Sequence, residues 1–162
     1  MTTYKTSITT QLSQLSNMER IYLDHAATTP LSKEAFDAMY PYFSNQFGNA
    51  NSQHGFGRDG AGAVLEARQS IASSLGAKPN EIYFTSGGTE ADNWAIKGVA
   101  KKYASKGKHI ISTKIEHHAV LHTLDALKKD GYEITLLDVD SEGFVDLEEL
   151  EKAIRPDTIL IT

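Results

Sequence analysis

A short stretch around two glycines carries the clearest chemical signal in the 162-residue chain, residues 84–93 with the sequence FTSGGTEADN. A β-prone run over residues 81–85 stops at the glycines, and a helical pattern begins at Thr89. Glycine lets a ligand approach the backbone closely, and the first N–H groups of a helix have no partner within the helix and carry partial positive charge. The Thr89 hydroxyl offers one more hydrogen-bond donor. This arrangement predicts a site for a phosphate group.

An ordinary strand-to-helix turn explains the same residues without a ligand. Thr89 is then a normal helix N-cap, and Glu90 and Asp92 carry the charge that the first turn of a helix favours. The stretch has neither the Gly-Lys-Ser/Thr of a Walker A loop nor the G-x-G-x-x-G spacing of a dinucleotide site. From these residues alone, both interpretations stay open.

Composition excludes several classes of protein. Hydrophobic residues make up 40% of the chain and charged residues 23%, which is typical of a soluble globular protein. The net charge is −5 and there is no basic run, which argues against nucleic-acid binding. No stretch approaches about 18 apolar residues, the length of a membrane span, and the N-terminus has no apolar signal core, so we expect a cytoplasmic protein. There is no cysteine, which excludes disulfides, thiolate nucleophiles and Cys-ligated zinc within these residues.

The elements that must position the glycine turn alternate between strands and helices. We expect strands at residues 21–23, 81–85, 109–113, 132–137 and 158–162, and helices starting at Ser32 and at residues 58–75, 89–105, 119–129 and 146–154. From residue 81 onward the order is β-α-β-α-β-α-β, which predicts a parallel sheet covered by helices. Ligands of such sheets bind beyond the C-terminal ends of the strands, where Gly88 and His117 both fall.

The two ends of the chain have their own signatures. Residues 1–17 are rich in Ser, Thr and Gln, which predicts a flexible N-terminal extension ahead of a domain at residues 18–162. Small α/β domains usually close with a helix, whereas this sequence stops on a parallel strand. We therefore expect these residues to be the N-terminal part of a longer protein.

Two patterns resemble metal sites, but their context favours simpler explanations. Residues 138–149 fit positions 1, 3, 5, 6, 9 and 12 of an EF-hand calcium loop. Because a strand pattern precedes them and there is no second such loop, we favour a βα loop whose acidic residues cap the helix near Asp146. His118 and His122 lie four residues apart on a helix, as metal ligands can. With no third ligand nearby, we favour structural or solvated histidines and expect no metal.

Four motifs in order carry a family resemblance: Asp24-His25-Ala26-Ala27-Thr28-Thr29-Pro30, Gly48-Asn49-x-x-Ser52-x-His54, residues 85–93, and Glu116-His117-His118-Ala119-Val120-Leu121. With these motifs the sequence, from about residue 18 to residue 162, resembles the cysteine desulfurases, class-V aminotransferase-like enzymes of the fold-type I pyridoxal-phosphate superfamily. The resemblance implies the N-terminal part of an α/β large domain, a mainly parallel sheet with helices on both faces. The sheet would be incomplete, because in this family later strands separate the strand like residues 81–85 from the strand like residues 109–113.

The resemblance also assigns roles by position. Gly88 and Thr89 match the pair that binds the phosphate of pyridoxal 5'-phosphate, which agrees with the phosphate site predicted from the glycine turn. His117 matches the catalytic histidine that stacks on the pyridine ring and handles protons, and a planar imidazole that titrates near neutral pH suits both tasks. The segments near the substrate entrance are matched by His25, Asn49 and His54. Glu90 and Asn93 also match marked family positions, and we interpret both as supports of the turn.

The implied reaction removes sulfur from L-cysteine to give L-alanine and an enzyme persulfide for iron–sulfur cluster assembly or other sulfur transfer. The implied partners are L-cysteine, a second copy in a homodimer and a sulfur-acceptor protein. In the family the Schiff-base lysine and the nucleophilic cysteine lie downstream, and Lys114, although beside His117, does not match that lysine and is interpreted as solvated. We therefore expect the 162-residue chain to be inactive alone. A selenocysteine lyase and a non-catalytic dimerisation or binding module are the alternatives.

Overall fold

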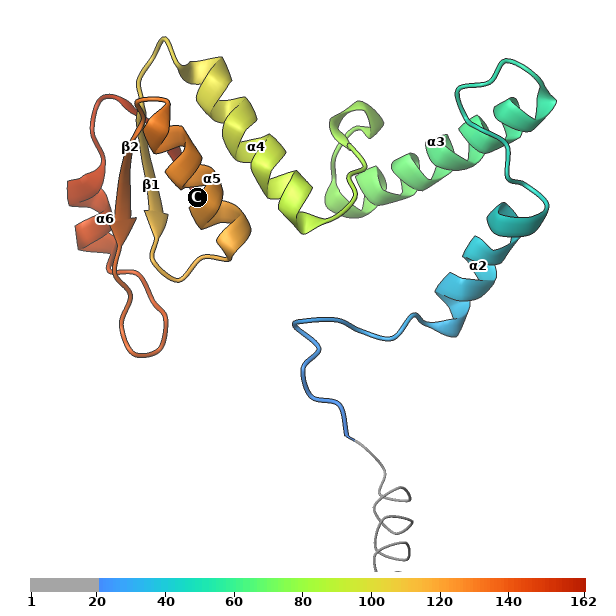
Figure 1. Cartoon of the computed structure of the whole chain (residues 1–162), viewed down its shortest axis with the longest axis horizontal. Coiled ribbons are helices and arrows are strands. Elements are labelled where there is room, and N and C mark those ends of the chain that lie inside the picture. Colours follow the sequence, from blue (N-terminus) through green and yellow to red (C-terminus); the bar gives the residue numbers. More distant parts are fainter. Residues whose placement is uncertain (1–20) are drawn as a thin grey trace, which may run out of the picture. The chain divides into compact units, whose positions relative to one another are not determined.

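The computed structural model describes residues 21–162, so the extension predicted at residues 1–17 lies outside the described part of the chain. The chain divides into two compact units, Met1–Pro79 and Asn80–Thr162, and each is described by itself (Figure 1). Within residues 21–162, no helix has the length and apolar character needed to cross a membrane.

The first unit is built from two helices, α2 (Lys33–Ser44) and α3 (Gly55–Leu75). Ser32 caps α2 as predicted, since its Oγ accepts a hydrogen bond from the Ala35 N–H at 3.1 Å. Pro41 lies inside α2, which continues to Ser44. Proline removes one N–H donor from the helix, but the Pro41 carbonyl still accepts the Asn45 N–H at 2.9 Å, so the last turn is retained.

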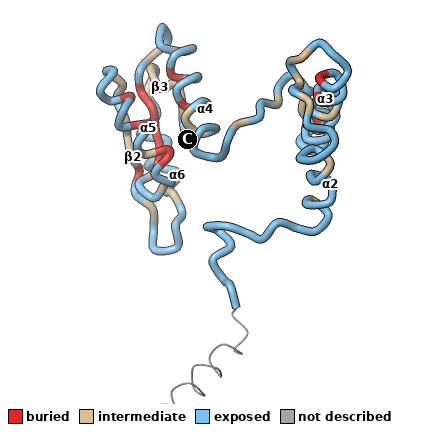
Figure 2. The backbone as a smooth tube through the Cα atoms, turned by 45° about the vertical axis from the view of Figure 1, so that its right-hand side comes forward, coloured by how far each residue is buried: buried red, intermediate tan, exposed pale blue. Residues whose placement is uncertain are grey.

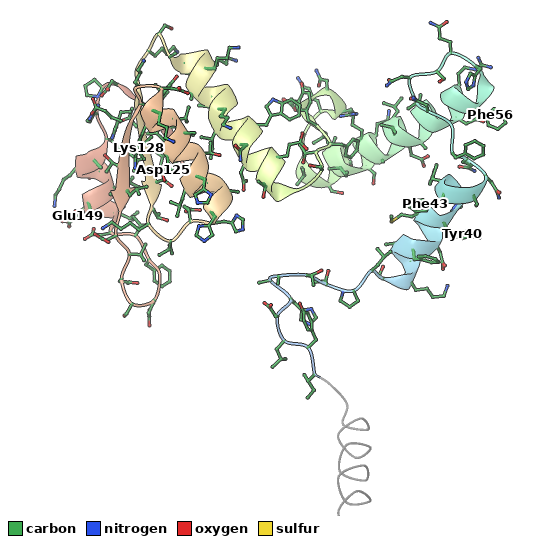
Figure 3. All side chains as sticks on the ribbon, in the orientation of Figure 1. Tyr40, Phe43, Phe56, Asp125, Lys128 and Glu149 are labelled. Atoms are coloured by element: carbon green, nitrogen blue, oxygen red, sulfur yellow. The ribbon has the colours of Figure 1, made fainter. Side chains whose placement is uncertain are left out.

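Helix α3 starts at Gly55, a little before the predicted residue 58, and it ends at Leu75 as predicted. Gly76 terminates it in the left-handed conformation, with φ of 64°. A residue with a Cβ is strained at such an angle, which is why the glycine marks the helix end. Phe56 lies at the start of α3 (Figure 3). The Phe47 ring stacks on the ring of Phe56, and this contact holds the loop before α3 close to the helix.

The second unit has a three-stranded parallel sheet flanked by helices, as the alternating pattern predicted (Figure 1). Its elements are a short 3-10 helix η1 (Pro79–Glu81, which begins at the last residue of the first unit), α4 (Gly88–Tyr103), β1 (His109–Thr113), α5 (His118–Lys129), β2 (Glu133–Leu137), α6 (Leu147–Ala153) and β3 (Thr158–Ile161). The strand order is β2-β1-β3, with His109 of β1 opposite Glu133 and Thr158.

Two predicted strands are wrong. Residues 21–23 have no regular structure and are exposed, and residues 82–85 follow η1 as an irregular segment. A strand forms only beside another strand, and among the described residues the sheet consists of β2, β1 and β3. An apolar, β-branched run therefore does not make a strand where no neighbouring strand is present.

The core of this unit lies between the sheet and helices α4 and α5. Its buried members are Ile96, Ala100, Ile110, Val120, Leu124 and Leu127. Figure 2 shows the buried residues of this unit gathered in β1 and along α5 and α4. The Tyr132 hydroxyl donates to the Ala100 carbonyl at 2.9 Å and so fastens the start of β2 to α4. This packing holds the N-terminal ends of α4 and α5 in a fixed relation.

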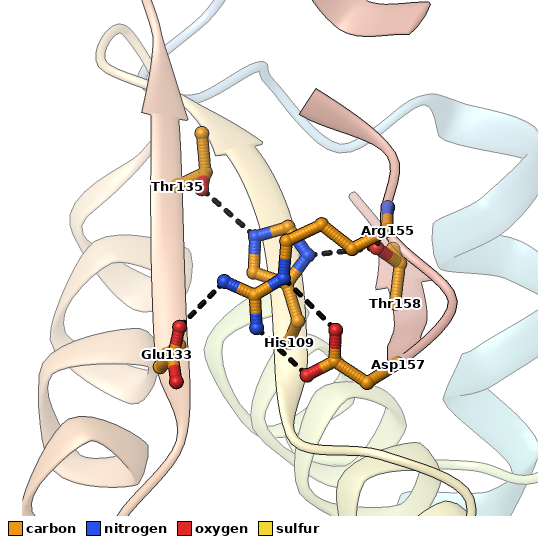
Figure 4. Close-up of polar contacts among 6 residues, drawn as sticks. All are labelled: His109, Glu133, Thr135, Arg155, Asp157 and Thr158. Carbon is orange, nitrogen blue, oxygen red and sulfur yellow. Dashed lines mark hydrogen bonds and ion pairs between the residues drawn. The ribbon is translucent and has the colours of Figure 1, made fainter. Parts of the chain in front are cut away.

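A buried histidine joins the three strands on their other face (Figure 4). His109 has no exposed surface, and its Nδ1 and Nε2 lie 2.7 Å from the Thr158 hydroxyl and 2.8 Å from the Thr135 hydroxyl. The Arg155 guanidinium, paired with the carboxylates of Asp157 and Glu133, lies beside it. Burial, assisted by the charge of Arg155, lowers the pKa of His109, so the ring is neutral in the folded protein at neutral pH.

Candidate functional site

The N-terminus of α4 presents free backbone donors at the two glycines. Gly87 is the N-cap residue and makes no side-chain capping bond, and the first hydrogen bond within the helix runs from the Ala91 N–H to the Gly87 carbonyl at 3.1 Å. The N–H groups of Gly88, Thr89 and Glu90 precede that bond and have no carbonyl to bind within the helix. A Cβ placed on Gly87 or Gly88 would meet no atom within 4 Å, so no other described residue packs against the Cβ side of these two glycines.

Two side chains brace this turn, as predicted. The Glu90 carboxylate accepts hydrogen bonds from the Ser86 N–H at 2.6 Å and the Ser86 hydroxyl at 2.7 Å, and these bonds lower the pKa of Glu90. The Asn93 amide donates to the Thr89 carbonyl at 2.9 Å. The interpretation of Thr89 as an ordinary N-cap is wrong, because helix α4 begins one residue earlier and Thr89 lies within its first turn. The turn is therefore built by Glu90 and Asn93, which leaves the Thr89 side chain out of the capping role.

His117 occupies the N-cap position of α5. Its Nδ1 accepts a hydrogen bond from the Ala119 N–H at 3.1 Å, which orients the ring at the start of the helix. Because Nδ1 is the acceptor, a neutral His117 ring carries its proton on Nε2. The structure thus assigns the two ring nitrogens different tasks, one structural and one available for proton exchange.

Thr89 and His117 come together at one cavity of about 280 Å³. Helices α4 and α5 pack directly against each other, and both residues stand at the helix starts. The sequence predicted that the glycine turn and His117 would share an edge of the fold, and the cavity confirms that they are neighbours. The other residues that line the cavity are Asn93, Lys97, His118, Ala119, His122 and Thr123.

The three predicted entrance residues belong to the first unit. The Asn49 side-chain oxygen accepts the Asn51 N–H at 2.9 Å, and His54 is the N-cap residue of α3, although its side chain makes no capping bond. The His25 ring makes an edge contact with Tyr22 at 5.2 Å between centroids. Thr89 and His117 lie in the second unit, and the entrance role of the three residues stays a prediction.

The residues that resembled metal ligands in the sequence have other partners. The Asp140 carboxylate accepts the N–H groups of Glu142 and Phe144, both at 2.9 Å, and these bonds lower its pKa. Asp146 is the N-cap residue of α6 and accepts the Glu148 N–H at 2.8 Å, which confirms the capping interpretation. The element that precedes this loop is β2, whereas an EF-hand requires a helix there.

Lys114 follows β1, close to His117 in the sequence. Its ammonium pairs with the Asp138 carboxylate at 2.7 Å, and both side chains are more than half exposed. The pair joins the C-terminal ends of β1 and β2 at the surface. A surface pair of this kind fits the interpretation of Lys114 as a solvated residue.

The donors at the start of α4 fit a phosphate group. Three backbone N–H groups lie at the positive end of the 16-residue helix α4, and its N-cap residue Gly87 has no side chain to cap them. The neighbouring carboxylate of Glu90 is engaged by Ser86. An imidazole with a fixed orientation stands across the same cavity from Thr89. The arrangement can hold an anionic group at one end and present a planar ring with an exchangeable proton at the other.

Comparison with known proteins gives a family match for most of the chain. The family model described as Aminotransferase class-V matches residues 21–162. The cysteine desulfurase IscS of Dictyoglomus turgidum is 58% identical over 142 residues, which cover 88% of this chain and 36% of the relative. The putative cysteine desulfurase IscS 1 of Bacillus subtilis is 56% identical over 145 residues, covering 90% of this chain and 38% of the relative.

Solved structures agree with this assignment. A NifS-like protein superposes with a TM-score of 0.85 at 40% identity, covering 88% of this chain and 39% of that one. An apo cysteine desulfurase from Thermococcus onnurineus NA1 has a TM-score of 0.77 at 29% identity, with 87% and 35% of the two chains covered. The chain therefore spans little more than a third of the length of these relatives. It belongs to the class-V aminotransferase family, whose members depend on pyridoxal phosphate, and it is a homologue of the N-terminal part of the cysteine desulfurases.

Proposed function

We propose that this chain forms the cofactor-binding N-terminal part of a pyridoxal-phosphate-dependent cysteine desulfurase. The observation that carries the proposal is the identity of 56–58% to proteins named cysteine desulfurase over about nine-tenths of the chain. The proposed reaction converts L-cysteine and an enzyme thiol into L-alanine and an enzyme persulfide. The carbon–sulfur bond of the substrate breaks, a sulfur–sulfur bond forms on the enzyme, and the substrate carbon gains a proton.

Gly88 and Thr89 are proposed to bind the phosphate of the cofactor. Their backbone N–H groups and the Thr89 hydroxyl supply the donors, and the helix dipole of α4 favours the negative charge. Glu90 and Asn93 act as positioning residues, because each holds part of the turn through a hydrogen bond. When bound, the cofactor supplies an electron sink for the substrate carbon that carries the amine.

His117 is proposed to stack on the cofactor ring and to move a proton. The bond from Ala119 to Nδ1 keeps the imidazole plane in one orientation and leaves the proton on Nε2. Nε2 of an imidazole can give up a proton and take one up again, which is what a general acid–base group must do. Replacing the ring would therefore affect cofactor binding and proton transfer together.

The rest of the machinery is proposed to come from further polypeptide. The chain has no cysteine, so the thiol that receives sulfur must come from another segment or another chain. The exposed faces of Tyr83 and Trp94, 66% and 54% accessible, form an edge-to-face pair beside a second cavity of about 580 Å³ along α4. We propose that the remaining part of the fold covers this apolar surface. A homodimer, a sulfur-acceptor protein, a role in iron–sulfur cluster assembly and a cytoplasmic location complete the proposal.

The first test separates cofactor binding from turnover. The protein is titrated with pyridoxal phosphate and binding is followed by the absorption of the cofactor. Thr89→Val is the test variant, and Thr29→Val, at an exposed threonine of the first unit, is the matched control. Loss of one hydrogen bond to a charged phosphate is expected to weaken binding about tenfold or more, because such bonds contribute about 1.5–3 kcal/mol. Equal affinities for the two variants would contradict the assignment of Thr89.

The second test concerns the reaction. The chain is co-expressed with the complementary C-terminal part of a cysteine desulfurase relative, and alanine release from L-cysteine is measured, with L-selenocysteine as the comparison substrate. We expect alanine from L-cysteine only in the co-expressed sample. Turnover by the 162-residue chain alone would contradict the proposed division of the machinery. A strict preference for L-selenocysteine would show that the protein is a selenocysteine lyase and not a cysteine desulfurase.

A further inference from the structure

The turn between β1 and α5 determines where His117 lies. Strand β1 ends at Thr113, and three residues separate it from His117, the N-cap residue of α5. The Lys114 N–H donates to the Leu137 carbonyl at 3.0 Å and so ties the start of the turn to the end of β2. The His117 carbonyl accepts hydrogen bonds from two N–H groups of the first turn of α5. The backbone is therefore anchored at both ends of the turn, and the residues between depend on their side chains.

One side-chain hydrogen bond spans this turn. The Thr113 hydroxyl donates to the Glu116 carboxylate at 2.9 Å, and both residues are half-buried. A hydrogen bond to a charged oxygen is about twice as strong as one between neutral groups. Glu116 directly precedes His117 in the chain. The bond therefore connects the last residue of β1 with the residue before the N-cap of α5.

The other two side chains of the turn lie at the surface. The Lys114 ammonium pairs with the Asp138 carboxylate, but both side chains are more than half exposed, and water and salt weaken such a pair. Ile115 is 62% exposed. Within the turn, the bond between Thr113 and Glu116 is therefore the side-chain contact best placed to fix the residue that follows.

The turn before α4 is braced in a similar way. There the Ser86 hydroxyl donates to the Glu90 carboxylate at 2.7 Å. In both turns, a hydroxyl of the preceding segment donates to a glutamate beside the start of the helix. These two helix starts meet at the cavity lined by Thr89 and His117. Both must be held accurately, because a misplacement of about 1 Å can cost about a hundredfold in reaction rate.

We propose that Thr113 and Glu116 are positioning residues for His117. This inference rests on the proposed function, because it concerns the ring that is assigned there to cofactor stacking and proton transfer. The contact runs from the end of β1 through the Thr113 hydroxyl to the Glu116 carboxylate, and the next residue along the backbone carries the imidazole. The ring reaches the Ala119 N–H only when the His117 backbone is held at the N-cap position. Loss of the bond between Thr113 and Glu116 would let the ring adopt more than one orientation.

The first test follows the His117 ring in the 162-residue chain without cofactor. Heteronuclear NMR distinguishes a ring nitrogen that carries a proton from one that does not, and it is recorded at mildly alkaline pH, above the ordinary imidazole pKa of about 6.5. In the wild type we expect the proton on Nε2 alone, because Nδ1 accepts the Ala119 N–H. Thr113→Val and Glu116→Ala should give a mixture of the two tautomers. Thr113→Ser and Glu116→Gln, which keep the donor and the acceptor, should restore the wild-type signal.

A control variant tests whether the effect belongs to this bond. Lys114→Gln removes only the surface ion pair of the same turn and should keep the wild-type signal. A tautomer mixture in Lys114→Gln would overturn the inference, because any weakening of the turn would then disturb the ring. A wild-type signal in both Thr113→Val and Glu116→Ala would also overturn it.

The second test measures alanine release in the co-expressed sample described above. Thr113→Val and Glu116→Ala should each lower kcat about tenfold or more, because a displaced ring transfers protons poorly. The affinity for pyridoxal phosphate should fall by a smaller factor, since the donors at the start of α4 are untouched. The double variant should lose no more than either single variant, because both changes remove the same bond.

Two outcomes of the second test would contradict the positioning role. They are a normal kcat in both single variants, and losses that multiply in the double variant. Failure of the proposed function gives a different result, in which the wild type neither binds pyridoxal phosphate nor releases alanine. The tautomer measurement then decides the inference by itself, since it requires neither cofactor nor turnover.

Discussion

Replacing His109 by leucine tests how the sheet beneath the site is held together. Leucine has a side chain of similar size but no hydrogen-bonding atom. The substitution therefore removes two hydrogen bonds, those to the hydroxyls of Thr158 and Thr135 at 2.7 and 2.8 Å. Each such bond contributes about 1 kcal/mol net, so His109→Leu should lower the free energy of unfolding by about 2 kcal/mol. Since 1.4 kcal/mol is a factor of ten, the equilibrium constant for unfolding should rise about thirtyfold. The measurement is urea unfolding at mildly alkaline pH, followed by circular dichroism.

The pH dependence of the same variant provides the sharper measurement. Burial and the charge of Arg155 lower the pKa of His109 in the folded protein, whereas the unfolded chain titrates near the ordinary value of about 6.5. As the pH falls through about 6.5, the unfolded chain takes up a proton that folded His109 does not bind, so the stability of the wild type falls. Leucine has no proton to bind. The stability difference between wild type and His109→Leu should therefore be largest above neutral pH and should shrink toward about pH 5.

A matched variant separates the lost hydrogen bond from the lost titration. Thr135→Val removes one of the two hydroxyl partners and keeps the histidine, so it should cost about 1 kcal/mol and retain the pH dependence of the wild type. All three proteins share the other histidines of the chain, so any contribution from them cancels in the differences. Parallel stability curves for wild type and His109→Leu between about pH 5 and 8 would refute the reasoning, because they would mean that His109 binds protons equally in the folded and unfolded states.

Three further predictions concern the backbone and the acidic loop. Gly107→Ala should destabilise the protein by about 1–3 kcal/mol in urea unfolding, because its Cβ would lie 2.1 Å from the Asp157 carbonyl oxygen. Gly98→Ala, in the interior of α4 with nothing within 4 Å of its Cβ, should instead stabilise the protein by up to about 1 kcal/mol. If both substitutions changed the free energy of unfolding in the same direction, the close contact between Gly107 and Asp157 would be contradicted. Asp146→Ala should cost about 1 kcal/mol and speed amide exchange at Glu148 and Glu149, and unchanged exchange there would show that the cap is unimportant. Calcium should leave the thermal midpoint unchanged, since the Asp140 and Asp146 carboxylates already accept backbone N–H groups, and a rise that saturates with calcium would revive the EF-hand interpretation.

Features set by neighbouring residues were predictable from the sequence. Ser32 caps α2, Gly76 ends α3, and Glu90 braces the turn before α4 because each acts on backbone groups within a few positions of itself. The three parallel strands were predictable for a related reason, since β1, β2 and β3 are joined by helices within this chain. Local hydrogen bonding and short connections therefore account for the correct part of the fold prediction.

Features that depend on distant contacts were missed. The hydrogen bonds of His109 reach residues 26 and 49 positions further along the chain. Their sequence signal is limited to a threonine in each of the two neighbouring strands, Thr135 and Thr158. The cavity shared by Thr89 and His117 depends on how α4 packs against α5. The spacing of His118 and His122 on one helix resembles a metal pattern, but it does not reveal that Lys97 of α4 lines the same cavity. The spacing of residues along one helix does not show which side chains a neighbouring helix places beside them.

Residues 81–85 do not form the predicted strand, and this affects the proposed cofactor site that follows them. In a complete parallel sheet, the strand before a glycine turn aims the following helix at the ligand. Here α4 begins at Gly88 although residues 82–85 are irregular, and its first turn is fixed by bonds from Ser86 to Glu90 and from Asn93 to Thr89. The donors of the glycine turn are therefore organised by residues within five positions of them, while their direction relative to the sheet depends on a strand partner. Phosphate affinity and catalytic alignment then have separate structural origins, so the phosphate affinity of the turn should persist in the 162-residue chain while turnover requires the added strands.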